Sequence, residues 1–274
     1  MAVTHVYARG LGAGYLRTQL QEMLEHRDLL VLLTQKELKV KYKGTALGFF
    51  WSLLNPLLMM VVYTAVFTVI ARFPVDRYPV FLLAALLPWT AFSASLLAST
   101  NSIVLNQNLV RRVRFPVEFL PLSIVLSYLA NLVPSLGILF VFALVFHQPL
   151  GWPLLALPVL IVLQGLFTIG ISLLVSSLTV YLRDVEHLVT LAMTVWFFGT
   201  PVIYPLSIFA GRPLGVLLDA NPMTWLMDSY QRIWHANQWP QPQFVGAFAV
   251  AAIAVAVAGQ LVFTRLSRRF AEEV

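Results

Sequence analysis

The sequence lacks cysteine altogether and contains little charge. Only 11% of its 274 residues are Asp, Glu, Lys or Arg, whereas 59% are hydrophobic. A soluble domain carries about 25% charged residues, so the composition predicts an integral membrane protein. The absence of cysteine excludes disulfide bonds, thiolate metal sites and a cysteine nucleophile.

Ionisable side chains are also absent from six long apolar segments, each suited to cross a membrane as a helix. These segments run over about 47–71, 79–104, 120–146, 153–178, 188–204 and 244–263. Ionisable residues inside a span usually mark an ion or proton pathway. Their absence argues against a proton- or sodium-coupled carrier, although backbone carbonyls can still bind sodium. We therefore predict an all-α integral membrane fold with six transmembrane helices.

Sequence signatures of catalysis are missing too. There is no phosphate-binding GxxxxGK[ST] loop, and the five histidines have no metal-ligand spacing. The first thirty residues contain charge and no apolar core, so we expect no cleavable signal peptide. Asp219, Asp228 and His235 are the remaining candidates for chemistry. We favour structural capping for them, because Asp219 precedes the turn signal Asn221-Pro222, and we predict no catalytic residue and no metal.

The most informative stretch that is present, residues 36–60, joins a basic half to an apolar, aromatic half. The basic half carries four lysines, Lys36, Lys39, Lys41 and Lys43. A helix changes in this way where it passes from the cytoplasmic membrane surface into hydrocarbon. Upstream, residues 15–33 place apolar side chains at helical spacing. This pattern predicts an amphipathic helix in the membrane interface, or one packed on a partner protein.

Lysine and arginine are distributed unevenly between the two ends of the predicted bundle. The N-terminal side carries 14 of them and the opposite side carries 4, which places both termini in the cytoplasm. The predicted organisation is a cytoplasmic region over 1–46, a six-helix transmembrane domain over 47–264 and a cytoplasmic tail over 265–274. Prolines and tryptophans in 205–243 predict two short re-entrant or outer-face helices between spans 5 and 6.

Five segments together resemble one transporter family. They are 27–58, 111–123, 181–189, 200–205 and 221–233, and they occur in the expected order and topological positions. From about Arg27 to Arg269 the chain resembles the membrane subunit of type-2 ABC exporters, in the polysaccharide and O-antigen permease group. Each segment alone is a weak signal, and the set of five is a strong one.

The resemblance implies a homodimer of this subunit, joined to two cytoplasmic ATPase subunits that bind ATP and Mg. It implies export of a polysaccharide attached to a polyprenyl diphosphate lipid across the bacterial inner membrane. Two alternatives remain at this point. The same fold can export teichoic acid, capsule or a small lipophilic drug. A protein of another class, a membrane enzyme acting on a polyprenyl-linked substrate, would use the three polar residues of the outer loop.

Three sets of site residues follow from the residues and the resemblance together. The substrate channel is predicted to be lined by Phe49, Phe50, Trp51, Asn55, Tyr63, Phe67, Trp196, Phe197, Phe198 and Tyr204. The lipid diphosphate and membrane interface are assigned to Lys36, Lys39, Lys41, Tyr42 and Lys43. Contacts with the ATPase are assigned to Arg111, Arg112, Arg114, Arg183, Asp184 and Glu186.

Each set also has a simpler explanation. Aromatic side chains are common where helices face lipid or the membrane interface. Lysines attract anionic headgroups at about 1 kcal/mol per charge. Arginines on the cytoplasmic side satisfy the positive-inside rule without contacting a partner.

Overall fold

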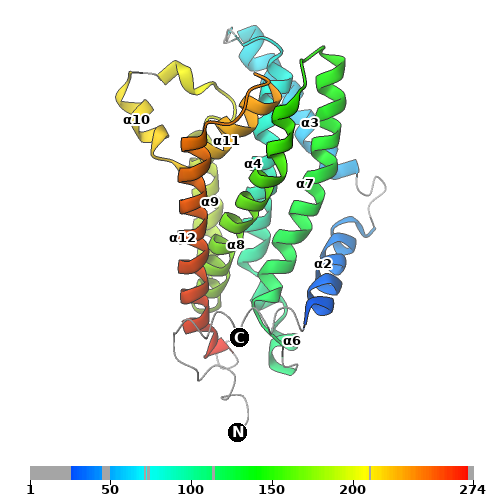
Figure 1. Ribbon diagram of the computed structural model, residues 1–274. Coiled ribbons are helices and arrows are strands. Elements are labelled where there is room, and N and C mark those ends of the chain that lie inside the picture. Colours follow the sequence, from blue (N-terminus) through cyan, green and yellow to red (C-terminus); the bar gives the residue numbers. More distant parts are fainter. Residues whose placement is uncertain are drawn as a thin grey trace.

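The computed structural model describes residues 26–44, 50–70, 72, 75–112, 115–209 and 211–270. Within these residues every regular element is helical, which confirms the all-α prediction. Four long helices form the bundle in Figure 1: α4 (Tyr78–Thr100), α7 (Phe119–Val145), α8 (Leu157–Tyr181) and α12 (Pro242–Ser267). Each is long and apolar enough to cross a membrane, α8 together with the preceding 3-10 turn η2 (Trp152–Ala156). They correspond to the second, third, fourth and sixth predicted spans.

The other two predicted spans are shorter helices. In the first, α3 (Phe50–Thr64) continues as the π-helix η1 (Ala65–Ile70). In the fifth, α9 (Val185–Phe198) begins before the predicted Leu188 and ends well before the predicted Tyr204. The early end has a local cause, because proline disfavours helical backbone in the residue before it, and Pro201 follows Thr200. By length and composition, four helices among the described residues qualify as membrane spans, and the first and fifth predicted spans are represented by shorter apolar helices.

The basic stretch is itself helical. Helix α2 (Arg27–Tyr42) runs past the predicted end at Leu33 and lies beside the lower part of α7 (Figure 1). Gly44 follows with φ 77°, in the left-handed region that commonly ends a helix at glycine. Most of the amphipathic helix predicted over 15–33 lies outside the described residues.

Two ends of the bundle differ in character. At one end lie α5 (Ser102–Leu105), α6 (Gln107–Arg112), the start of α9 and the end of α12. At the other end, residues 205–243 form the 3-10 turn η3 (Leu206–Phe209), α10 (Pro213–Asp219) and α11 (Pro222–Trp234). We refer to this second end as the α10–α11 end. Helix α11 packs against α4, α8 and α12 and closes it.

Small residues allow two of the long helices to pack closely. Helices α8 and α12 meet where Gly170 faces Gly259, and a Cβ atom on Gly259 would collide with the carbonyl oxygen of Gly170. In α4, Ser95 and Ser99 are buried, and their hydroxyls donate to backbone carbonyls of their own helix. Small side chains of this kind allow helix backbones to approach closely in membranes.

Candidate functional site

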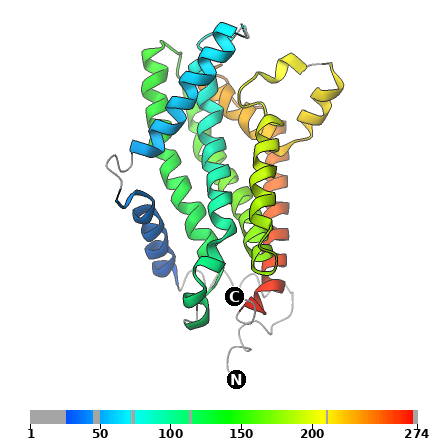
Figure 2. The same cartoon turned by 180° about the vertical axis from the view of Figure 1, so that it is seen from behind.

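Helices α3 and α9 flank α4 on one face of the bundle (Figure 2). This arrangement brings together predicted channel residues that are far apart in the sequence. The ring of Tyr63 in α3 lies 6.3 Å from that of Phe197 in α9 and 6.3 Å from that of Phe67. The aromatic sets of the first and fifth predicted spans are therefore neighbours.

Trp196 is packed inside this face. Its ring meets Phe92 edge-on at 5.4 Å and lies 6.4 Å from both Trp89 and Phe167. Its indole Nε1 donates a hydrogen bond to Asn221 Oδ1 at 2.9 Å. Trp196 therefore joins α9 to the interior and to the start of α11.

Other predicted channel residues lie at the surface. Phe50 is 68% exposed, Trp51 49% and Phe198 60%, and Asn55 is also exposed. Phe49 lies outside the described residues. The predicted channel set thus divides into interior members, such as Trp196, and members that face outward from α3 and α9.

The outward faces of α3 and α9 are strongly apolar. Exposed aliphatic side chains there include Leu58, Val61 and Val62 of α3, Val69 of its continuation η1, and Leu188, Leu191 and Val195 of α9. On α9 these positions and Phe198 fall on one side of the helix, at intervals of three and four residues. This face needs a covering of lipid or of another protein.

The predicted lipid-diphosphate lysines do not point the same way. Lys36, Lys39 and Lys43 are exposed, whereas the Lys41 ammonium lies 3.8 Å from the centre of the Tyr128 ring in α7. Lys36 Nζ also lies 3.4 Å from Asn106 Oδ1, close to α6. Burial lowers the pKa of Lys41 to about 8, because a low-dielectric environment disfavours the charged form. Of the fifth member of this set, Tyr42, only the helical backbone is described.

The residues predicted to contact the ATPase gather at one end of the bundle. Arg111 and Arg112 are exposed at the end of α6. Arg183, Asp184 and Glu186 are exposed around the turn between α8 and α9. Figure 1 shows both segments at the end opposite α10 and α11. Arg114 lies outside the described residues.

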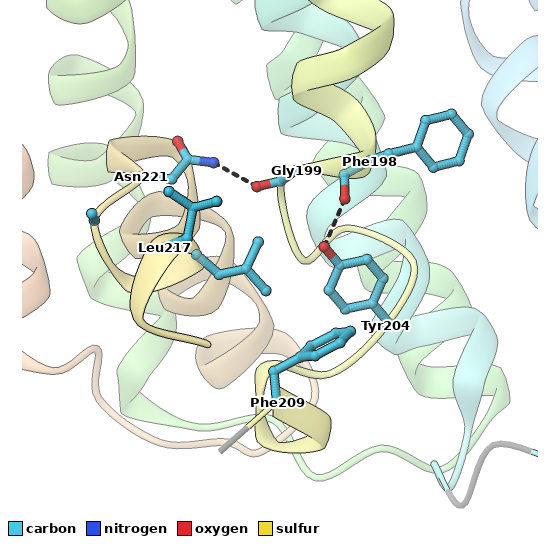
Figure 3. A pocket seen from close by; sticks show the side chains of 8 residues that line it. Phe198, Gly199, Tyr204, Phe209, Leu217 and Asn221 are labelled. Carbon is cyan, nitrogen blue, oxygen red and sulfur yellow. Dashed lines mark hydrogen bonds between the residues drawn. The ribbon is translucent and has the colours of Figure 1, made fainter. Parts of the chain in front are cut away.

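A cavity of about 440 Å³ opens between the end of α9 and helix α10 (Figure 3). We call it the α9–α10 pocket. Its lining consists of Phe198, Gly199, Tyr204, Phe209, Leu217, Leu218, Ala220 and Asn221. The rings of Tyr204 and Phe209 meet edge-on at 5.3 Å. The Tyr204 hydroxyl donates to the Phe198 carbonyl at 2.8 Å, which fixes the loop after α9.

Asn221 organises the inner wall of this pocket. Its Nδ2 donates to the Gly199 carbonyl at 2.8 Å and to Thr200 Oγ1 at 3.0 Å. Its Oδ1 accepts from Trp196 Nε1 and, at 3.0 Å, from the backbone N–H of Met223. Asn221 is thus the N-cap of α11 and also holds the end of α9 in place.

Asp219, Asp228 and His235 line a second, larger cavity of about 710 Å³ on the other side of α10. Asp228 forms an ion pair with Arg232 at 2.8 Å, although burial is the stronger influence and raises the pKa of Asp228. His235 Nε2 lies 2.7 Å from the carbonyl oxygen of Asp76. The Asp219 carbonyl accepts from Trp225 Nε1 at 2.7 Å. No group of three or more potential metal ligands occurs among the described residues.

A buried polar chain links α11 to the middle of the bundle. Tyr230 Oη donates to Gln164 Oε1 at 3.0 Å, and Gln164 Nε2 donates to the Pro88 carbonyl at 2.9 Å. Neither residue is predicted from the sequence, because Gln164 carries no charge within its predicted span and Tyr230 lies between two predicted spans. The signal available was a lone glutamine in an otherwise apolar segment. For Asn221, the turn signal was noticed, but its bonds to Trp196 and Gly199 require the tertiary structure.

Comparison with known proteins gives consistent matches. Residues 28–234 match the ABC-2 type transporter family. The chain is 36% identical over 255 residues to the O-antigen export system permease protein RfbA of Myxococcus xanthus, covering 93% of this chain and 98% of that protein. It is also 30% identical to two proteins of the same name from Klebsiella pneumoniae, one over 249 and the other over 247 residues. Each of these alignments covers 89% of this chain and 94% of the relative.

Proposed function

The chain belongs to the ABC-2 type transporter family, and from this membership we propose that it is the permease of an ATP-driven exporter for an O-antigen-like polysaccharide. The observation that carries the proposal is the similarity, over nearly its whole length, to relatives named as O-antigen export permeases. Family membership makes the chain a transport subunit and implies an ATPase partner in the cytoplasm. This assignment leaves no role for the alternative of a membrane enzyme.

We propose that two copies of the chain assemble through the face formed by α3 and α9, with the cargo passing along that face. The exposed apolar side chains of both helices support this arrangement, since a partner subunit would cover them. Trp51 and Phe198 then face the path. We expect Trp51→Ala to slow export of long chains, measured as the length distribution of surface polysaccharide. The control Trp152→Ala removes a more exposed indole (78% against 49% for Trp51) near the α10–α11 end, and equal effects of both variants would contradict the path.

The exposed residues at the opposite end are proposed to receive the motion of two ATPase subunits, which bind ATP and Mg. Their clustering on α6 and on the α8–α9 turn supports this role. Arg111→Glu/Arg112→Glu is expected to abolish export while leaving membrane insertion normal. Arg268→Glu/Arg269→Glu makes the same change of charge at the same end and serves as control. If both variants lost export, Arg111 and Arg112 would have no specific role in ATPase contact, and their charge would serve membrane topology alone.

We propose that the exposed lysines of α2 attract the diphosphate of a polyprenyl-linked polysaccharide, because lysine binds phosphate as a point charge. Replacing Lys36, Lys39 and Lys43 by Gln is expected to reduce stimulation of the ATPase by the lipid-linked substrate. Basal ATPase activity of the purified complex is the control. If the substrate stimulated the ATPase of the variant equally well, these lysines would serve only to attract lipid headgroups.

The decisive test of function is deletion of this chain in its host. If the proposal holds, nascent lipid-linked polysaccharide accumulates on the cytoplasmic side of the inner membrane, and the intact chain restores its export. Extraction and gel analysis of glycolipids, with and without surface labelling, measure both quantities. Normal surface polysaccharide after deletion would contradict the proposal. Loss of teichoic acid, capsule or drug export would transfer it to a different cargo on the same fold.

A further inference from the structure

The α9–α10 pocket has the chemistry of a hydrocarbon site. Its wall is formed mainly by the rings of Tyr204 and Phe209 and by the side chains of Leu217 and Leu218, whereas the Phe198 ring points away from the cavity. Figure 3 shows the ring of Tyr204 and the side chain of Leu217 on opposite sides of the cavity. Apolar surface of this kind is covered favourably by an apolar ligand.

The polar side chains of the wall are already engaged within the protein. An asparagine side chain has two donor hydrogens and two acceptor lone pairs, and Asn221 uses all four. The Tyr204 hydroxyl donates its single proton to the Phe198 carbonyl. The side chains of the wall therefore have no unused hydrogen-bond donor for a saccharide. A hydrocarbon needs no such donor.

The cavity on the other side of α10 has a more polar wall. Arg232, Gln238 and Asp228 contribute polar groups to its wall, and Phe209 is common to both cavities. A polar ligand at this end of the molecule would therefore be drawn to that second cavity. The contrast across one short helix strengthens the assignment of the α9–α10 pocket to an apolar ligand.

The pocket is continuous with the exposed apolar face of α9. The exposed stripe of α9 runs through Leu188, Leu191 and Val195 and ends at Phe198, which lines the pocket. Phe198 also lies beside Phe197, whose ring is 5.4 Å away, and Phe197 meets Tyr63 on the proposed cargo path. A chain lying against this stripe of α9 thus comes to the edge of the pocket at Phe198.

We propose that the α9–α10 pocket holds a segment of the isoprenoid chain of the lipid-linked cargo at the α10–α11 end of the transporter. This inference rests on the proposed function, since the cargo must carry such an anchor. The exposed stripe on α9 leads along the proposed cargo path to the pocket, and the rings of Tyr204 and Phe209 pack against the branched chain. The pocket would keep the anchor beside the path while the saccharide passes.

The test uses the full chain in nanodiscs of phosphatidylethanolamine and phosphatidylglycerol. A polyprenyl phosphate with a diazirine on its chain is photoactivated, and labelled peptides are identified by mass spectrometry. A second sample contains phosphatidylethanolamine with the diazirine on an acyl chain. We expect the prenyl probe to label residues 198–221 and unlabelled polyprenyl phosphate to compete with it.

Two adjacent positions of α10 provide a matched pair. Leu217 and Val216 are 69% and 73% exposed, but only Leu217 lines the α9–α10 pocket. Leu217→Glu is expected to reduce labelling by the prenyl probe about tenfold, the loss that removing about two buried methylene contacts would cause. Val216→Glu introduces the same charge and is expected to leave labelling unchanged. Leu217→Gln replaces the first variant if Leu217→Glu does not elute as a single species.

Equal labelling by the acyl probe, with no competition by polyprenyl phosphate, would overturn the proposal and make the pocket an ordinary lipid site. Absence of labelling in residues 198–221, or equal losses in both glutamate variants, would also overturn it. None of these three results affects the proposed function. The deletion experiment tests that function separately, through accumulated glycolipid. If deletion caused no glycolipid accumulation but labelling succeeded, the proposed function would be contradicted while the pocket would still bind a polyprenyl chain.

Discussion

Asn221 connects more of the molecule than any one of its neighbours in the loop after α9. Its side chain caps α11, accepts the indole of Trp196 and holds the carbonyl of Gly199. A partly buried amide in this position satisfies several backbone and side-chain groups at once. Its loss would leave each of them without a partner, at about 1–3 kcal/mol for a buried group.

We therefore predict that Asn221→Ala lowers the free energy of unfolding by about 2 kcal/mol, which is roughly 4–8 °C in melting temperature for a chain of this size. Thermal unfolding in detergent, followed by tryptophan fluorescence, measures the change. Asn55→Ala removes an exposed amide from α3 and is expected to change stability by less than about 0.5 kcal/mol. Similar melting temperatures for Asn221→Ala and the unmodified chain would contradict the role of Asn221.

Lys41 gives a prediction of pH dependence. After reductive methylation with ¹³C-formaldehyde, its resonance should titrate near pH 8, whereas the ordinary lysine pKa is 10.5. An unfolded chain then binds more protons than the folded one between about pH 8 and 10.5, so this side chain favours folding increasingly as pH rises through that window. Lys41→Met identifies the resonance, and a midpoint near 10.5 would show that burial does not perturb Lys41.

For single residues, the sequence predicted which side chains matter better than it predicted their contacts. It placed Trp196 and Tyr63 among the aromatic residues of interest, and the structure brings their helices together. It could not show that Trp196 is a hydrogen-bonded interior residue, because its partner Asn221 lies 25 positions away. Lys41 likewise needed the position of α7 before it could be separated from the neighbouring lysines.

Among the described elements, α8 and α12 form the most extensive helix–helix contact. Gly170 and Gly259 lie at their crossing, and added side-chain atoms there meet backbone atoms of the other helix. Backbone atoms cannot move aside as a flexible side chain can. The two helices must therefore separate if either glycine gains a side chain.

We predict that Gly259→Ala destabilises the protein by about 1–3 kcal/mol, the range typical of overpacking. Gly246→Ala on the same helix is the control, since its added carbon would meet no neighbouring atom within 4 Å. The control should be neutral or stabilise by about 0.5–1 kcal/mol, because alanine loses less backbone entropy in a helix. Fluorescence-detected size exclusion after heating measures both variants, and equal melting temperatures would refute the packing argument.

Helix positions were the most predictable property of the elements. The spans over α4, α7, α8 and α12 follow from long apolar runs without charge, which leave few alternatives in a membrane. The end of α9 was placed too late, because aromatic residues continue past Phe198 to Tyr204 although the backbone turns at Thr200–Pro201. The course of α2 along α7 was not predicted, since amphipathic spacing does not state which surface covers the apolar side.

For the whole molecule, the proposed dimer places a second copy of the chain over the face formed by α3 and α9. In a two-fold dimer, residues close to the symmetry axis lie near their own copies in the partner. The chain contains no cysteine, so single cysteines can be introduced without removing native ones.

We predict that Val61→Cys in α3 or Val195→Cys in α9 gives a covalent dimer with a short bifunctional thiol reagent in membranes. Val250→Cys in α12 is equally exposed but lies outside the proposed interface, so it should remain monomeric. Denaturing gel electrophoresis without reductant distinguishes the products. A dimer from Val250→Cys, with none from the other two variants, would move the interface to α12.

The bonds at the α10–α11 end also bear on how the chain is made. Tyr78 Oη donates to the Ile203 carbonyl at 2.6 Å, 125 positions later, and His235 reaches the Asp76 carbonyl across 159 positions. During synthesis the early spans enter the membrane long before these partners leave the ribosome. The first helices therefore lie in the bilayer without these two contacts until the later residues are synthesised. A ribosome that stops before Asn221 would release a chain that quality-control proteases should recognise as unfinished.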